Sequence, residues 1–230
     1  MKDVFVPTQN YNHFENLCGE LMSSSAGIEM AAIIGRAGRG KTTSAQRMVA
    51  LNPYVAYVRF EDRLSPVALI REIAFAVAGV RPGHTQGCMD VIRAELARSR
   101  RLIMVDEADR MGLKHLNTMR DFHDVCNSPV VLIGEEPLRA RLQRERRLIS
   151  RTRELLEFGP VTQPDVVVFY RNALSQDVSG QAAELVRHAE GDFRMVVRDA
   201  LAVERIMEAS GLKRISPEVI REVIGNGKHA

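Results

Sequence analysis

The chain carries one segment with a strict spacing of glycine, lysine and threonine, GRAGRGKT at residues 35–42. It follows a short apolar run, 28–34, that is typical of a buried strand, and it opens a stretch with helical spacing, 41–51. Glycines in such a turn let backbone N–H groups point inward at a helix N-terminus, where they surround a phosphate. We expect Lys41 to reach the β- and γ-phosphates and the Thr42 hydroxyl to bind Mg²⁺. A glycine-rich turn with this spacing by chance is the alternative, and the strand, loop and helix in order argue against it.

A second apolar run, Leu102–Val105, ends in Asp106 and Glu107. Ligands of open α/β sheets bind beyond the carboxyl ends of the strands, so this pair is expected near the glycine loop. There Asp106 would hold Mg²⁺ through water, and Glu107 would polarise the attacking water. A solvated start of a helix is the alternative interpretation of the two acids.

Together these motifs predict ATP and Mg²⁺ as cofactors and ATP hydrolysis as the activity. The residues predicted to bind nucleotide are Gly35, Arg36, Ala37, Gly38, Arg39, Gly40, Lys41, Thr42, Thr43 and Asp106. Thr42 and Asp106 are the predicted metal ligands, and Lys41 and Glu107 are predicted to act in catalysis.

Apolar runs and helical stretches alternate along the first two thirds of the chain. The predicted strands are 28–34, 54–60, 102–105, 130–133 and 155–158, and the predicted helices are 13–22, 41–51, 65–79, 90–98, 113–125 and one from about 137. Strands that alternate with helices and lack hairpin turns predict an α/β fold, a three-layer parallel sheet flanked by helices.

The strand signal disappears from Pro164 onward. Helices are predicted at 164–174, 179–200 and 216–224, separated by glycine or Ser-Pro. We therefore expect two domains, an α/β nucleotide-binding domain at 1–160 and a small helical lid domain at 161–230.

Composition is that of an ordinary soluble protein, with 45% hydrophobic and 27% charged residues. No apolar run approaches the roughly 18 residues of a membrane helix, and the first residues lack the apolar stretch of a secretory signal. Cys18, Cys88 and Cys126 form no CxxC pair, which favours a reducing cytoplasm. Zinc binding by histidine–cysteine pairs would need further ligands at zinc spacing, and the sequence has none.

The net charge of +3 permits a nucleic-acid partner without demanding one. Of the 32 basic residues 27 are arginine, the better side chain for phosphate contacts, although a high-GC genome produces the same bias.

The motifs resemble the AAA+ class of ATPases, and within it the branch of the transposition protein B of Mu-like phages and the TnsC and TniB transposon regulators. The resemblance rests on GRAGRGKTT at 35–43, LIMVDEADRM at 102–111, VVLIGEEPL at 130–138, SRTRE at 150–154 and GDFRMVVRDA at 191–200, with Met119-Arg120 between them. It covers nearly the whole chain and implies a homo-oligomer, a ring or helical filament, that forms on double-stranded DNA.

The resemblance also implies two catalytic arginines. Arg151 would reach the γ-phosphate of a neighbouring subunit, with Arg147 and Arg153 as rivals, and Arg194 matches the second sensor of the class. The first sensor, usually Asn or Thr, would have to be Glu135 or be absent. For the dense arginine run at 139–153, a solvated surface and a stripe of phosphate contacts for DNA are the alternatives.

Loops near the ends of the predicted strands carry further basic residues. Arg59 and Arg63 follow the second strand and Lys114 follows the acidic motif, so they are the candidates for contact with the DNA backbone. Plain surface residues are the alternative for each.

The resemblance implies an ATP-dependent DNA-binding protein of transposition, a phage or transposon recombination factor that selects target DNA and activates a transposase partner in the cytoplasm of a bacterial host cell, with no membrane association. The alternatives are an ATP-responsive adaptor of DNA replication, such as a helicase loader, and a small-molecule phosphoryl transferase. The transferase would need a substrate-binding insertion, and the acidic pair favours water as the nucleophile.

Overall fold

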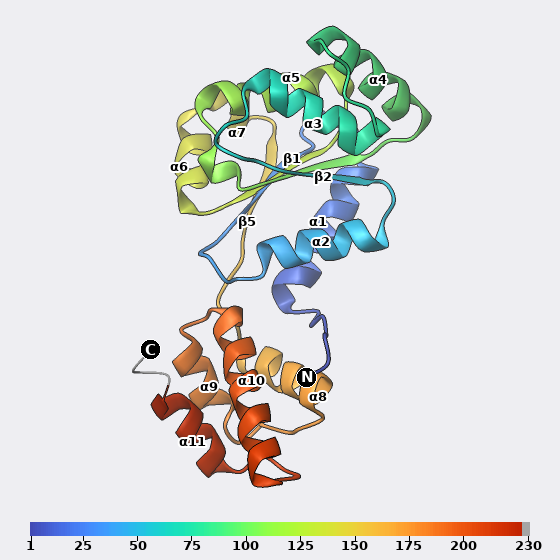
Figure 1. Cartoon of the computed structure of the whole chain (residues 1–230). Helices are drawn as coiled ribbons and strands as arrows, with labels where there is room; N and C mark the ends of the chain where they lie inside the picture. Colours follow the sequence, from blue (N-terminus) through green and yellow to red (C-terminus); the bar gives the residue numbers. More distant parts are fainter. Residues whose placement is uncertain (227–230) are drawn as a thin grey trace. The chain divides into compact units, whose positions relative to one another are not determined.

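The computed structural model describes residues 1–226, and the chain divides into two compact units (Figure 1). The sheet unit comprises Asn10–Arg36 and Gly40–Phe158. The helical unit comprises Met1–Gln9, Ala37–Arg39 and the chain from Gly159 onward.

The sheet unit contains one five-stranded sheet in the order β2-β3-β4-β1-β5, and all of its paired strands are parallel. The strands are β1 Met30–Ile34, β2 Val55–Arg59, β3 Leu102–Asp106, β4 Val130–Gly134 and β5 Thr152–Glu157. The predicted α/β fold with a parallel sheet flanked by helices is confirmed.

Helices cover both faces of this sheet. They are α1 Gln9–Ser23, α2 Lys41–Leu51, α3 Pro66–Ala78, α4 Thr85–Arg98, α5 Leu113–Cys126, α6 Glu136–Arg144 and α7 Arg146–Ile149, with a 3₁₀ turn, η1, at Ala108–Arg110. In Figure 1, α1 and α2 lie on one side of the strands and α3, α4 and α5 on the other.

The sheet is apolar on both faces, which explains why β1, β3 and β4 are continuous apolar runs. Successive side chains of a strand point to opposite faces. Ala32, Val105 and Leu132 belong to one large apolar cluster with side chains of helices α3, α4, α5, α6 and α7. Their buried neighbours Ile33 and Met104 point to the opposite face of the sheet.

Local signals set the ends of the helices. The Ser65 hydroxyl accepts a hydrogen bond from Ala68 N at 3.2 Å, and Pro66 stands in the first turn of α3. α4 begins at Thr85, before the predicted Asp90, because the His84 ring accepts from Gly87 N at 2.8 Å and caps the helix.

The last strand begins earlier than predicted, at Thr152 rather than Leu155. Its first residues are polar but pair in parallel with β1, with Met30 opposite Thr152. Exposure at the edge of the sheet explains why the apolar pattern starts late.

The helical unit holds α8 Gln163–Leu174, α9 Ala182–Ala189, α10 Phe193–Ser210 and α11 Pro217–Asn226. The single helix predicted at 179–200 is wrong. Glu190 and Gly191 have φ of 50° and 81°, a left-handed turn that ends α9, and the Asp192 carboxylate then caps α10. Phe169, Val196 and Ile220 belong to a second apolar cluster within this unit. None of the helices in residues 1–226 has the length and apolar character needed to span a membrane.

Candidate nucleotide-binding site

The glycine loop connects the end of β1 to the start of α2. Gly38 and Gly40 have φ of 75° and 86°, a region that side chains other than glycine rarely adopt. At Gly35 an added Cβ would lie 2.8 Å from the backbone oxygen of Phe158, so only glycine fits there. The loop that the spacing predicts is therefore formed, directly before the first turn of α2 at Lys41.

The Lys41 ammonium is held by carbonyls of its own loop. Its Nζ donates to Gly35 O at 2.6 Å and to Arg36 O at 3.0 Å. Burial lowers the pKa of Lys41, and the carboxylates of Glu135 and Asp106 oppose that shift. Carboxylates thus lie near the Lys41 ammonium, which is available to bind an anion that enters the loop.

Asp106 ends β3 and is almost fully buried, 3% exposed. Its Oδ2 accepts from Thr42 Oγ1 at 2.7 Å and from Tyr57 Oη at 2.8 Å, and its Oδ1 accepts from Glu107 N at 2.8 Å. The predicted metal ligands Thr42 and Asp106 thus lie side by side, and a hydroxyl beside a carboxylate is the oxygen donor set that suits Mg²⁺ with phosphates.

Within residues 1–226 no group of three or more His, Cys, Asp or Glu side chains is arranged to hold a metal ion alone. A magnesium ion in this site would therefore depend on phosphate oxygens and water for its other ligands, as is usual for nucleotide-bound Mg²⁺.

Glu107 follows Asp106 in the left-handed conformation, with φ of 58°. Its Oε1 lies 3.1 Å from Arg59 NH2, and its Oε2 lies 3.7 Å from Arg110 Nε. The Glu107 carboxylate is thus engaged by two guanidinium groups. Arg59, a predicted DNA contact, is exposed and makes this ion pair.

The end of β4 approaches the acidic motif closely. Glu135 N donates to Asp109 Oδ1 at 3.1 Å, and an added Cβ at Gly134 would lie 2.7 Å from Asp109 N. Arg141 fixes this turn by donating to Asp109 O and, at 2.6 Å, to Met111 O. Glu135, at the position expected of the first sensor, has an exposed side chain.

Arg151 lies at the amino ends of the strands, whereas the glycine loop lies at their carboxyl ends. Its carbonyl accepts from Met30 N, at the start of β1, whereas the loop follows the end of β1, about 13 Å away for five residues. Its Nε donates to Asp124 Oδ1 at 2.6 Å. The glycine loop of its own subunit is thus out of reach of Arg151. Its role toward a neighbouring subunit stays a prediction.

The other predicted arginines and lysine are surface residues. Arg153 pairs with Glu20 at 3.2 Å, and Arg147 is exposed. Arg194, in the first turn of α10, is 68% exposed and pairs with Asp192.

Arg63 pairs with Glu61 at 2.7 Å and is 83% exposed. Lys114 is exposed in the first turn of α5, and Thr43 is exposed in α2. Their functional roles stay predictions.

Sequence reasoning missed Tyr57, Asp109 and Arg141. The sequence indicated only that Tyr57 is an aromatic residue of a strand, because its partner Asp106 is 49 positions away. The strand order would have predicted this contact, since β2 and β3 are neighbours whose carboxyl ends coincide. Asp109 had a local signal, an acid three residues after Asp106, but its contact with β4 depends on the fold.

The site and fold define a class: an open parallel α/β sheet with a glycine loop after β1 and an acidic end on β3, which is the architecture of P-loop nucleotide-binding proteins. Residues 26–142 match the family model described as an AAA domain. The chain therefore belongs to the AAA domain family.

One known protein is similar over about half of the chain. A "Potential ATP-binding protein" of Staphylococcus aureus is 29% identical over 129 residues, which are 52% of this chain and 48% of that protein. The chain thus matches about half the length of that relative.

Solved structures share the fold at low sequence identity. The Aeropyrum pernix ORC2 protein in its ADPNP and ADP complexes is 18% identical over 97% of this chain and 68% of its own, with a TM-score of 0.64. The Aeropyrum pernix ORC1 protein in complex with DNA is 20% identical over 98% of this chain and 66% of its own, with a TM-score of 0.61.

Proposed function

We propose that the chain is an ATPase that hydrolyses ATP with Mg²⁺ at the glycine loop. The observation that carries this proposal is the 2.7 Å hydrogen bond from Thr42 Oγ1 to Asp106 Oδ2. It joins the loop at the end of β1 to the acidic end of β3, so two oxygen ligands of the predicted metal meet where the phosphates would lie.

The chain's own residues divide the work of this reaction. Backbone N–H groups of 35–42 and the Lys41 ammonium would bind the phosphates, and Thr42 and Asp106 would hold the metal, which would supply charge neutralisation. Glu107 accepts the proton of the attacking water, which requires that its carboxylate be released from Arg59, now 3.1 Å away. A slow basal rate is expected, because Glu107 is engaged and the predicted finger Arg151 must come from a second subunit.

The finer proposal is an ATP-dependent oligomer on double-stranded DNA that acts in transposition, selecting target DNA and activating a transposase. It is supported by the resemblance of the two motifs and the helical segment to the Mu B, TnsC and TniB branch. An exposed run of arginines on α6 and α7, including Arg144 and Arg147, supplies surface charge suited to DNA or to a neighbouring subunit. ATP then acts as an assembly switch, because it binds the oligomeric interface better than the free subunit.

A replication adaptor such as a helicase loader or initiator is the second candidate. The ORC proteins share the fold of this chain, and one of them, ORC1, is a DNA complex by its own description. At 18–20% identity this likeness speaks for the fold alone, so the two candidates need a functional test. A small-molecule phosphoryl transferase is the third candidate, and the position of Glu107 beside Asp106 favours water over an organic acceptor.

Phosphate release from ATP, measured with and without Mg²⁺ and plasmid DNA, tests both levels of the proposal. We expect magnesium-dependent hydrolysis that rises with DNA, and filaments or rings on DNA by electron microscopy with ATP. Lys41→Ala is the negative control for the active site. Hydrolysis that is indifferent to DNA, with DNA left bare, would reject the DNA-bound oligomer, and no magnesium-dependent hydrolysis would reject the ATPase.

Addition of a purified transposase or a replicative helicase separates the first two candidates. Stimulated strand transfer supports the transposition role, and stimulated loading of the helicase supports the adaptor.

A further inference from the structure

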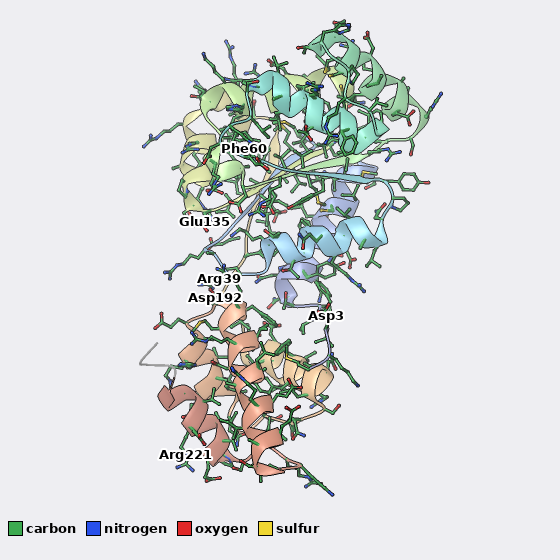
Figure 2. All side chains as sticks on the ribbon, viewed as in Figure 1. Asp3, Arg39, Phe60, Glu135, Asp192 and Arg221 are labelled. Atoms are coloured by element: carbon green, nitrogen blue, oxygen red, sulfur yellow. The ribbon has the colours of Figure 1, made fainter. Side chains whose placement is uncertain are left out.

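Tyr57 reaches the acidic end of the neighbouring strand. In the parallel register of β2 and β3, Arg59 lies opposite Asp106 and Tyr57 lies opposite Met104. Tyr57 is therefore two residues before the level of Asp106, a diagonal distance that a long aromatic side chain spans. Its hydroxyl donates to Asp106 Oδ2 at 2.8 Å. Figure 2 shows Phe60, the buried residue that follows β2, among the densely packed side chains of the sheet unit.

The acceptor capacity of Asp106 is nearly filled. An ionised carboxylate has about four acceptor positions on its two oxygens. Thr42 Oγ1, Tyr57 Oη and Glu107 N occupy three of them at 2.7–2.8 Å. One acceptor position, on Oδ1, is left for magnesium or its bound water, and the carboxyl group is held by three donors.

Tyr57 and Thr42 differ in their part at this site. Both hydroxyls donate to Asp106 Oδ2, but Thr42 is also a predicted metal ligand, whereas the Tyr57 hydroxyl has the carboxylate as its partner.

We propose that Tyr57 is a positioning residue that fixes the orientation of the Asp106 carboxylate toward nucleotide-bound magnesium, through its hydroxyl at Asp106 Oδ2. The inference rests on the proposed function, since it concerns the same site. A residue that only packs against the sheet would need the ring alone, so the phenol hydroxyl separates the two roles.

Tyr57→Phe tests the inference, because it removes one oxygen and keeps the ring. The readout is binding of a fluorescent ADP analogue, first in EDTA and then along a Mg²⁺ titration. We expect the affinity in EDTA to stay within about twofold and the Mg²⁺ midpoint to rise about tenfold, the loss of one hydrogen bond to a charged group. Tyr54→Phe, which removes an exposed hydroxyl just before β2, is the matched control and leaves both values unchanged.

A double-mutant cycle makes the test specific for the pair. In an Asp106→Ala background, Tyr57→Phe should shift the Mg²⁺ midpoint no further, because the two groups act as one unit. A shift of equal size in both backgrounds would overturn the inference.

The remaining outcomes are also decisive. An unchanged midpoint in Tyr57→Phe overturns the inference, and so does an equal loss of affinity with and without Mg²⁺, since that indicates packing. Both results leave the proposed ATPase standing, because the wild type still binds nucleotide with Mg²⁺. Absence of magnesium-dependent binding in the wild type would instead reject the proposed function and the inference with it.

Discussion

The Arg59 guanidinium lies 3.1 Å from the Glu107 carboxylate. Arg59 ends β2, and Glu107 is the residue that follows β3. The two strands are neighbours, and Arg59 stands opposite Asp106 in their register. The candidate for water activation and a candidate for DNA contact are thus one ion pair. Under the proposed function, a DNA phosphate that attracts Arg59 would release Glu107 from this pair and would so couple DNA binding to hydrolysis.

Arg59→Ala should raise the basal rate of ATP hydrolysis. The pair is exposed on the arginine side, and such pairs contribute about 0.2–1 kcal/mol, so we expect an increase of about 1.4- to fivefold in kcat without DNA. Stimulation by DNA should shrink in the same variant. Arg63→Ala is the matched control, because Arg63 pairs with Glu61 and not with Glu107. A fall in basal kcat for Arg59→Ala would contradict the release model.

Glu107→Gln should separate nucleotide binding from hydrolysis. The amide keeps the size of the side chain but cannot accept a proton, and loss of a general base lowers rates about 10²- to 10⁴-fold. Nucleotide affinity with Mg²⁺, measured by fluorescence, should stay near the wild-type value. Glu61→Gln changes an exposed carboxylate nearby and should leave kcat intact. If Glu107→Gln retains its kcat, another residue activates the water.

Arg151→Ala tests the role assigned to this arginine in a neighbouring subunit. Removing such a finger lowers kcat about 10³-fold or more. Because Arg151 also pairs with Asp124 at 2.6 Å, Asp124→Asn is the control that breaks the same ion pair and keeps the guanidinium. We expect a loss of phosphate release in Arg151→Ala only. Equal effects in both variants would assign Arg151 to the stability of the subunit.

Restoration of activity would show that the arginine acts between subunits. We expect Arg151→Ala and Glu107→Gln each to be inactive alone. A mixture of the two variants should recover part of the rate, because a mixed interface joins an intact Glu107 to an intact Arg151. Failure to recover, with oligomers present by light scattering, would argue against action across the interface.

Glu29 should make the stability of the sheet unit depend on pH. It is fully buried, and although burial acts to raise its pKa, hydrogen bonds from the Ser24 hydroxyl and backbone N–H groups, together with His123, lower it overall. Because the folded pKa is below the unfolded value near 4.3, this stabilisation is present above that value and is lost as pH falls through the folded pKa.

Urea unfolding between pH 7 and pH 3 measures this effect. We expect Glu29→Gln to lower the free energy of unfolding at pH 7 by about 1–3 kcal/mol and to flatten its decline in acid. Glu154→Gln, at an exposed position of β5, should leave the curve unchanged. A decline of equal steepness in Glu29→Gln and wild type would show that other carboxylates carry the acid sensitivity.

Much of the fold was predictable because its signals are local. Each buried strand is a short apolar run, and the loop at 35–42 requires glycine for reasons of backbone geometry and close approach to Phe158. The turn at Glu190–Gly191 was missed because the helical pattern on both sides outweighed a local signal, the helix stop Gly191 followed by the N-cap residue Asp192. The start of β5 was missed because an edge strand has no need of apolar residues on every position.

Local sequence specifies the chemistry at two strand ends, a phosphate loop before a helix and Asp106 with Glu107 after an apolar run, because each motif is formed by neighbouring residues. Long-range packing sets which distant groups meet these motifs, through the strand order β2-β3-β4-β1-β5. That order puts Tyr57 on Asp106 and Arg59 on Glu107. Arg151 precedes β5 and lies beside the start of β1, so the length of β1 separates it from the glycine loop.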